Sequence, residues 1–135
     1  RPPPTHPLTP HSGPTRGAGG LGADTMIGGA GNDTFVFNTA LGVGNIDRIT
    51  DFNVVDDTII LDDAIFVGLA TGTLAASAFA ANLTGQAATA SDRIIYETDT
   101  GRLYYDSDGV GGAARVQFAT LTVGLALTNS DFFVF

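Results

Sequence analysis

Short apolar runs and apolar–polar alternation dominate the chain after residue 34, and both patterns are typical of β-strands. The first predicted strands are Phe35–Phe37, Ile46–Phe52 and Thr58–Leu61. The segment Leu74–Ala81 differs because it is rich in alanine and follows Thr73, a residue suited to a helix N-cap. The pattern therefore predicts a mainly β chain with one short helix.

A second group of strands is expected in the C-terminal half. Residues 93–97 and 102–106 flank Thr98-Asp99-Thr100-Gly101, a loop ending in glycine that predicts a β-hairpin. Residues 115–119 should add a third antiparallel strand, and the apolar residues 132–135 should form the last strand. These strands predict a sandwich-like, antiparallel arrangement for this half.

The N-terminal residues have a different composition. All six prolines and both histidines fall within residues 1–14, and proline disrupts helices and central strands. We therefore expect residues 1–18 to be an extended, disordered linker or a non-native remnant. The chain begins with Arg1 and shows no N-terminal signal peptide, so it is expected to be a piece of a longer protein.

The strongest motif is a tandem repeat with a period of nine residues. Residues 19–27 and 28–36 both read G-G-x-G-x-D-x-U-x, where U is a large apolar residue. The preceding block, residues 10–18, keeps only Gly13 in register and has Thr15 in place of the aspartate, so it is a decayed repeat or a linker. Repeats of this pattern wind the chain into a parallel β-coil, each supplying a turn and a short strand.

The chemistry of the repeats fits calcium. This ion takes about six to eight oxygen ligands from carboxylates and carbonyls. Glycine permits the tight, partly left-handed turns that direct several carbonyls toward one ion, and one aspartate per turn supplies charge. An ordinary Gly/Asp turn is the alternative, and the tandem match disfavours it.

Residues 19–36 resemble the RTX, or hemolysin-type, β-roll, and residues 19–135 resemble the C-terminal region of type I secreted proteins. The resemblance implies that each ion lies between turns on the same side of the roll. Its ligands would be glycine-turn carbonyls and the aspartate at position six of each repeat. Carried onto this sequence, the carboxylate ligands are Asp24 and Asp33, and the carbonyls come from around Gly20, Gly22, Gly29 and Gly31.

Two repeats supply only two half-sites, so further ligands are expected from neighbouring segments. In related domains the strand after the last repeat reads D-x-I-x-D-F, which residues 47–52 match. Asp47 is the preferred additional ligand and Asp51 the second choice. A turn cap or a solvated position is the alternative for both residues.

Three other acidic stretches are assigned no metal. The pairs Asp56-Asp57 and Asp62-Asp63 are expected to mark strand ends that face water. Asp106-Ser107-Asp108-Gly109 begins like an EF-hand loop but lacks the bidentate glutamate, so an acidic hairpin turn is expected there.

The last five residues, Asp131–Phe135, are acidic and then strongly apolar. Such a segment must pack against the rest of the protein or be recognised by a partner. An ordinary final strand is one interpretation. The ending also resembles the uncleaved C-terminal signal of type I secretion substrates. That resemblance implies an ABC transporter and its adaptor as partners, and an extracellular location for a protein of a Gram-negative bacterium.

The composition disfavours several classes of function. Six basic and 14 acidic residues give a net charge of -8, which disfavours nucleic acid and anionic membrane surfaces as partners. No apolar run is long enough for stable insertion into a membrane. The chain has no cysteine and no histidine after residue 14, so the folded region can form neither a Cys–His nor a Ser-His-Asp site. No catalysis is expected.

We therefore expect an all-β fold with a short parallel β-roll over residues 19–37 and an antiparallel, sandwich-like cap over residues 38–135. Its expected function is to bind Ca²⁺, to fold outside the cell and to carry the export signal. Two alternatives stay open. The chain could complete an enzyme, such as a protease or lipase, whose catalytic part lies upstream. A carbohydrate-binding or adhesive face could be formed by Arg93, Tyr96, Tyr104 and Tyr105.

Overall fold

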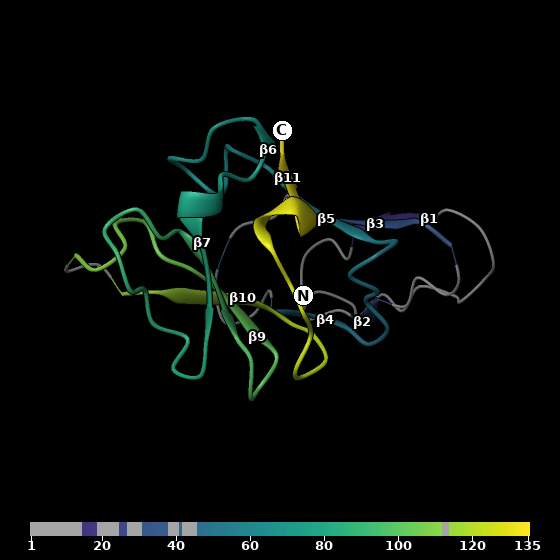
Figure 1. The fold of residues 1–135 in the computed structure, drawn as a ribbon. Helices are drawn as coiled ribbons and strands as arrows, with labels where there is room; N and C mark the ends of the chain where they lie inside the picture. The colour runs from purple at the N-terminus through teal and green to yellow at the C-terminus, as the bar shows by residue number, and fades with distance from the viewer. Residues whose placement is uncertain (1–14, 19–24, 27–30, 38–40, 42–45, 112–113) are drawn as a thin grey trace, which may run out of the picture.

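Two facing β-sheets make up the fold (Figure 1). The computed structural model describes residues 15–18, 25–26, 31–37, 41, 46–111 and 114–135. The first sheet has the strand order β1 (Thr15–Ala18), β3 (Asp33–Phe37), β5 (Thr58–Leu61), β11 (Phe132–Val134) and β6 (Gly72–Thr73). The second sheet has the order β2 (Thr25–Met26), β4 (Asp47–Ile49), β10 (Val116–Thr120), β9 (Arg102–Tyr105), β8 (Ile94–Glu97) and β7 (Phe79–Asn82).

The strands β1 to β5 form a parallel roll that extends beyond the expected residues 19–37 at both ends. Successive strands alternate between the two sheets, and β1, β3 and β5 run parallel in one sheet while β2 and β4 run parallel in the other. Residues 15–18 were expected to belong to the linker and instead form β1. Thr15 pairs with Asp33. Both residues stand at position six of the nine-residue pattern, so this pairing agrees with a decayed repeat over residues 10–18. Residues 1–14 lie outside the described part of the chain.

The C-terminal strands continue both sheets of the roll. As predicted, β8, β9 and β10 are antiparallel neighbours. However, β10 also pairs with β4 in parallel, and β11 pairs with β5 in parallel. These contacts satisfy the backbone groups that the last roll strands would otherwise leave unpaired at a sheet edge. The cap is therefore a mixed extension of the roll rather than a separate antiparallel sandwich.

The helix predicted over Leu74–Ala81 is wrong. A single 3₁₀ turn, η2 (Ala76–Ala78), is followed directly by β7. Strand β7 pairs with β8, and the ring of Phe79 lies 5.4 Å from that of Phe132, so tertiary pairing outweighs the helix propensity of alanine. A second 3₁₀ turn, η3 (Asn129–Asp131), precedes β11. None of the helices in the described segments has the length and apolar character needed to cross a membrane.

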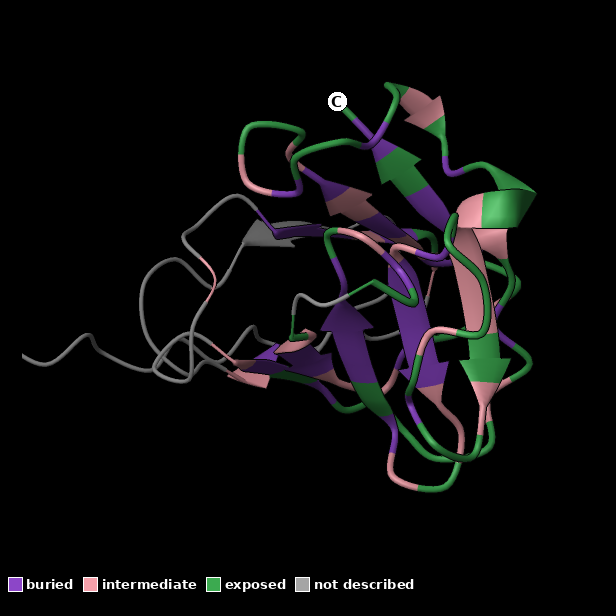
Figure 2. Ribbon diagram, turned by 90° about the vertical axis from the view of Figure 1, so that its left-hand side faces the viewer, coloured by how far each residue is buried: buried purple, intermediate pink, exposed green. Residues whose placement is uncertain are grey.

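The core fills the space between the sheets, where the buried faces of the strands meet (Figure 2). Phe118 of β10 connects the roll to the cap, because its ring packs edge-on against Phe37 at 5.4 Å and against Phe66 at 4.9 Å. Fully buried core side chains come from both sheets: Phe35, Ile59, Leu61 and Phe132 from the first, and Met26, Ile49, Ile94 and Leu103 from the second.

Candidate metal centre

Asp33 is a buried carboxylate at the start of β3. It follows the turn at Gly31, whose φ of 96° is a conformation that favours glycine. The Asp33 side chain is 1% exposed, and neither of its carboxylate oxygens has a hydrogen-bond partner in the described structure. Burial of an ionised carboxylate without donors is strongly unfavourable. The site therefore calls for a compensating positive charge.

Asp57 places a second carboxylate beside the first. It precedes β5, in which Thr58 pairs with Thr34 of β3. Its Oδ1 accepts a hydrogen bond from the backbone amide of Asp33 at 2.9 Å, and its Oδ2 accepts one from the amide of Asn53 at 2.8 Å. Burial raises the pKa of Asp57 above its ordinary value of 3.8, and the negative charge of Asp33 raises it further, while the two amide bonds act in the opposite direction.

The expectation that both members of the Asp56-Asp57 pair face water is wrong for Asp57, which is 4% exposed, whereas Asp56 is exposed. The sequence did hold a signal for this position. Residues 33–35 and 57–59 both read Asp-Thr-apolar, and the strand register places the two segments side by side. The spacing of 24 residues hides this match from a search at the nine-residue period.

The other predicted ligands are distributed differently. Asp47 is buried at the start of β4, in the second sheet, where it pairs with Ala119. Asp51 is half-buried and lies beyond the end of β4. The structure therefore places Asp33 and Asp47 in opposite sheets rather than in one cluster. The remaining predicted ligands, Asp24, Gly20, Gly22 and Gly29, lie outside the described residues.

Asp24 and Asp47 occupy equivalent positions in the sequence. Thr25, which follows Asp24, pairs with Arg48, which follows Asp47. In the same way, Asp33 and Asp57 precede the paired residues Thr34 and Thr58 of the first sheet.

The donor set of the Asp33 site fits a hard cation. Within the described segments, no three or more His, Cys, Asp or Glu side chains gather into a metal-binding group. A cation at Asp33 would therefore need backbone carbonyls in addition to carboxylates, and calcium accepts this mixture. Zinc is a poorer fit, because its sites in proteins are dominated by cysteine and histidine.

Comparison with known families agrees with this geometry. The model of the peptidase M10 serralysin C-terminal family matches residues 15–134. The chain belongs to this family. Serralysin C-terminal domains are non-catalytic, calcium-binding modules of secreted proteins and contain the RTX-type β-roll. A search of curated proteins gave no match.

The tyrosines of this serralysin C-terminal domain do not form an exposed stacking face. Tyr96, Tyr104 and Tyr105 are all at least nine-tenths buried. The hydroxyls of Tyr96 and Tyr105 donate to the carbonyls of Thr122 and Val67, respectively. The ring of Tyr104 is covered by Arg115, whose Cζ lies 4.1 Å from the ring centroid. A sugar could not stack on these rings in the folded domain.

Proposed function

We propose that this domain is the calcium-dependent folding and export module of a type I secreted protein from a Gram-negative bacterium. The observation that carries the proposal is the buried Asp33 carboxylate, which lacks a donor and lies beside the carboxylate of Asp57. The parent protein would carry its own activity elsewhere. Membership of a family described for M10 peptidases favours a protease over a lipase as that activity.

Calcium would be held at the Asp33 turn of the roll. Asp33 would supply the main carboxylate, and Asp57 would supply the second charge while fixing the start of β3 through its bond to the Asp33 amide. Carbonyls of the turn around Gly29 and Gly31 would complete the site, as the RTX resemblance implies. Asp47 and Asp24 would form the corresponding site on the other side of the roll, with Asp51 as a further candidate ligand.

Calcium binding would then drive folding. Without the ion, the carboxylates of Asp33 and Asp57 repel each other and lose hydration on burial, and both effects oppose closure of the roll. Because the site exists only in the folded state, the free energy of calcium binding becomes free energy of folding. A chain made in a calcium-poor cytoplasm would stay loose enough for export and would fold outside.

The burial of the C-terminal tail favours recognition of the export signal before the domain folds. Phe132 and Val134 are fully buried in β11, whereas Phe133 and Phe135 are 43% and 44% exposed. An ABC transporter and its adaptor could therefore contact the whole apolar tail only while the domain is unfolded. Once β11 has paired with β5, half of the signal is inaccessible.

Circular dichroism of the whole chain tests the folding part of the proposal. The protein is stripped with a chelator, dialysed, and titrated with calcium, with magnesium as the matched ion. We expect a gain of β-structure and a higher unfolding temperature with calcium and little response to magnesium, which keeps its hydration shell more tightly. A spectrum and an unfolding temperature that ignore both ions would refute calcium-driven folding.

Export is tested separately with a type I transporter and adaptor expressed in a Gram-negative host. We expect secretion of the wild-type chain and loss of secretion when both Phe132 and Val134 are replaced by serine. Replacement of the exposed Val123 by serine serves as the control, since it lies outside the tail and is 55% exposed. Secretion of the double variant at the wild-type level would exclude the tail as the signal.

A further inference from the structure

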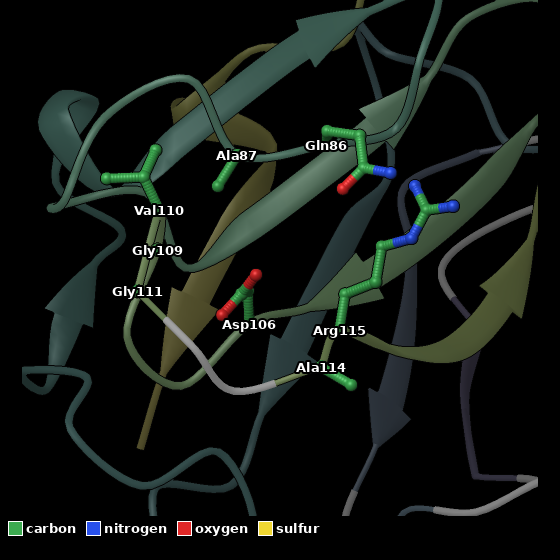
Figure 3. A pocket seen from close by; sticks show the side chains of 8 residues that line it. All are labelled: Gln86, Ala87, Asp106, Gly109, Val110, Gly111, Ala114 and Arg115. Carbon is green, nitrogen blue, oxygen red and sulfur yellow. The ribbon is translucent and has the colours of Figure 1, made fainter.

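A pocket of about 510 Å³ opens in the cap between the loop after β7 and the loop after β9 (Figure 3). Its polar side chains are Gln86, Asp106 and Arg115, and its walls include Gly109 and Gly111. It shares no residue with the metal centre. Its volume lies in the range of about 300–1,000 Å³ that is usual for small-molecule sites.

Arg115 is fixed in place at one side of the pocket. Its guanidinium lies over the ring of Tyr104, with Cζ 4.1 Å from the centroid, and its Nη1 donates to the carbonyl of Thr84 at 2.9 Å. Gly85 packs closely behind it, since a Cβ at this position would lie 2.7 Å from Nη1. A ligand would therefore meet a guanidinium that is already ordered, which reduces the entropy lost on binding.

Asp106 directs its carboxylate into the pocket from the end of β9, next to the start of β10, which Arg115 precedes (Figure 3). The residue is 6% exposed, and its Oδ1 accepts a long hydrogen bond, 3.3 Å, from the amide of Asp108. The side chain of Asp108 and the amide of Gly109 also interact with this carboxylate. Burial raises the pKa of Asp106 above 3.8. No ion pair links Asp106 to Arg115 in this part of the chain. The pocket thus presents an acceptor and a donor that do not neutralise each other.

We propose that this pocket binds a neutral polyhydroxylated ligand of the size of one sugar residue. Asp106 would accept hydrogen bonds from its hydroxyls, and Arg115 and Gln86 would donate to its oxygens. A hydroxyl group both donates and accepts, so one ligand satisfies both sides of the pocket. An ammonium ligand would be repelled by Arg115, and an anion would be repelled by Asp106. A zwitterion would have to give up the hydration of two charges.

The proposal is independent of the export function and differs from the alternative based on exposed tyrosines. In it, Tyr104 contributes by holding Arg115 rather than by stacking on the sugar. Recognition would rest on hydrogen bonds alone in an open pocket, so the expected affinity is low, with a Kd on the order of millimolar.

The test is an amide NMR titration of the calcium-saturated chain with methyl glycosides of glucose, galactose, mannose and N-acetylglucosamine. We expect saturable shifts for at least one sugar at the amides of Gly109 and Gly111 and at the side-chain amide of Gln86. The Asp106→Asn variant keeps the shape of the side chain but removes its charge, and should weaken binding about tenfold or more. Asp99→Asn, the same change at an exposed hairpin position, should leave binding unchanged.

Gln86→Ala provides a second variant at an exposed residue, for the case that Asp106→Asn fails to fold, and should also weaken binding. The proposal is overturned if no sugar gives saturable shifts at the pocket, or if Gln86→Ala and a folded Asp106→Asn bind as the wild type does. Shifts at the pocket with glycine but with none of the sugars would assign a zwitterion instead.

Discussion

The backbone amide of Asp33 donates a hydrogen bond to Oδ1 of Asp57 at 2.9 Å, although 24 residues separate them. The bond joins the neighbouring parallel strands β3 and β5 where both begin, and it brings two carboxylates into one buried place. Asp57 is satisfied there by two amides, whereas the Asp33 oxygens have no donor within the described structure. This asymmetry makes Asp33 the expected ion ligand and Asp57 the residue that positions it.

Replacement of Asp57 by alanine should destabilise the domain even when calcium is saturating. The change leaves the amide of Asp33, in a buried hydrogen bond, and the amide of Asn53, in a partly buried one, without their acceptors. Loss of a buried partner costs about 1–3 kcal/mol. We expect the free energy of unfolding in urea to fall by about 2–5 kcal/mol. Asp56→Ala, at the exposed neighbouring position, should change it by less than about 0.5 kcal/mol. Equal effects of the two substitutions would contradict the positioning role of Asp57.

Without calcium, the domain should gain stability on mild acidification. The pKa values of Asp57, Asp106 and Asp131 are all raised above 3.8, in each case chiefly by burial. The folded state therefore binds protons more readily than the unfolded state, and this contribution to stability is complete below 3.8 and lost as pH rises through the raised pKa values.

Circular dichroism of the calcium-free chain at a series of pH values measures this effect, because the folded fraction reports the free energy of unfolding. The free energy of unfolding should rise as pH falls through the raised pKa values toward 3.8. Asp57→Asn should show a flatter dependence, because the asparagine side chain does not titrate, while Asp56→Asn should behave as the wild type does. A slope that Asp57→Asn leaves unchanged would show that this carboxyl does not titrate in that range.

Phe118 should contribute to the stability of the roll and the cap together. Its ring is 2% exposed and packs against Phe37 of the roll and Phe66 of the cap. Phe118→Ala should lower the free energy of unfolding by about 3–5 kcal/mol, and Val123→Ala, at a position 55% exposed, by less than about 0.5 kcal/mol. Calorimetry of the wild type should show one transition; two separate transitions would mean that roll and cap have independent cores.

Gly101 and Gly124 offer a matched pair of glycine substitutions. Both have positive φ, 79° and 72°, so alanine at either position should cost about 1–2 kcal/mol in backbone strain. A Cβ on Gly101 would also overlap the carbonyl oxygen of Leu121, whereas one on Gly124 meets nothing within 4 Å. Gly101→Ala should therefore be destabilising by at least about 2 kcal/mol more than Gly124→Ala in thermal unfolding. Equal losses of stability in the two variants would show that the hairpin turn shifts to make room for the methyl group at position 101.

The sequence predicted the strands with strong apolar patterns and missed the features that depend on contacts between distant residues. The hairpin of β8 and β9 follows from its local turn residues. The strand identity of Phe79–Asn82 does not, because this alanine-rich segment becomes a strand only by pairing with β8.

The candidate site likewise combines a residue that the local sequence predicts with one that only contacts between distant residues reveal. Asp33 could be predicted because its nonapeptide contains the motif in one continuous stretch. Asp57 could not be found at the nine-residue spacing, because it lies 24 residues after Asp33, which is not a multiple of nine. Only the pairing of Thr34 with Thr58 reveals its equivalence. Likewise, nothing local in the sequence shows that Arg115 covers Tyr104.

The most direct measurement is a calorimetric calcium titration of the wild-type chain, Asp33→Asn and Asp99→Asn, with the unfolding temperature of each recorded at every calcium concentration. The account predicts that Asp33→Asn weakens calcium binding at least about tenfold and loses much of the stabilisation, which for one site is about 2.7 kcal/mol at one hundred times the Kd. Asp99→Asn should match the wild type. If Asp33→Asn binds calcium and is stabilised by it as the wild type is, the buried carboxylate of Asp33 is not a calcium ligand and the central claim is wrong.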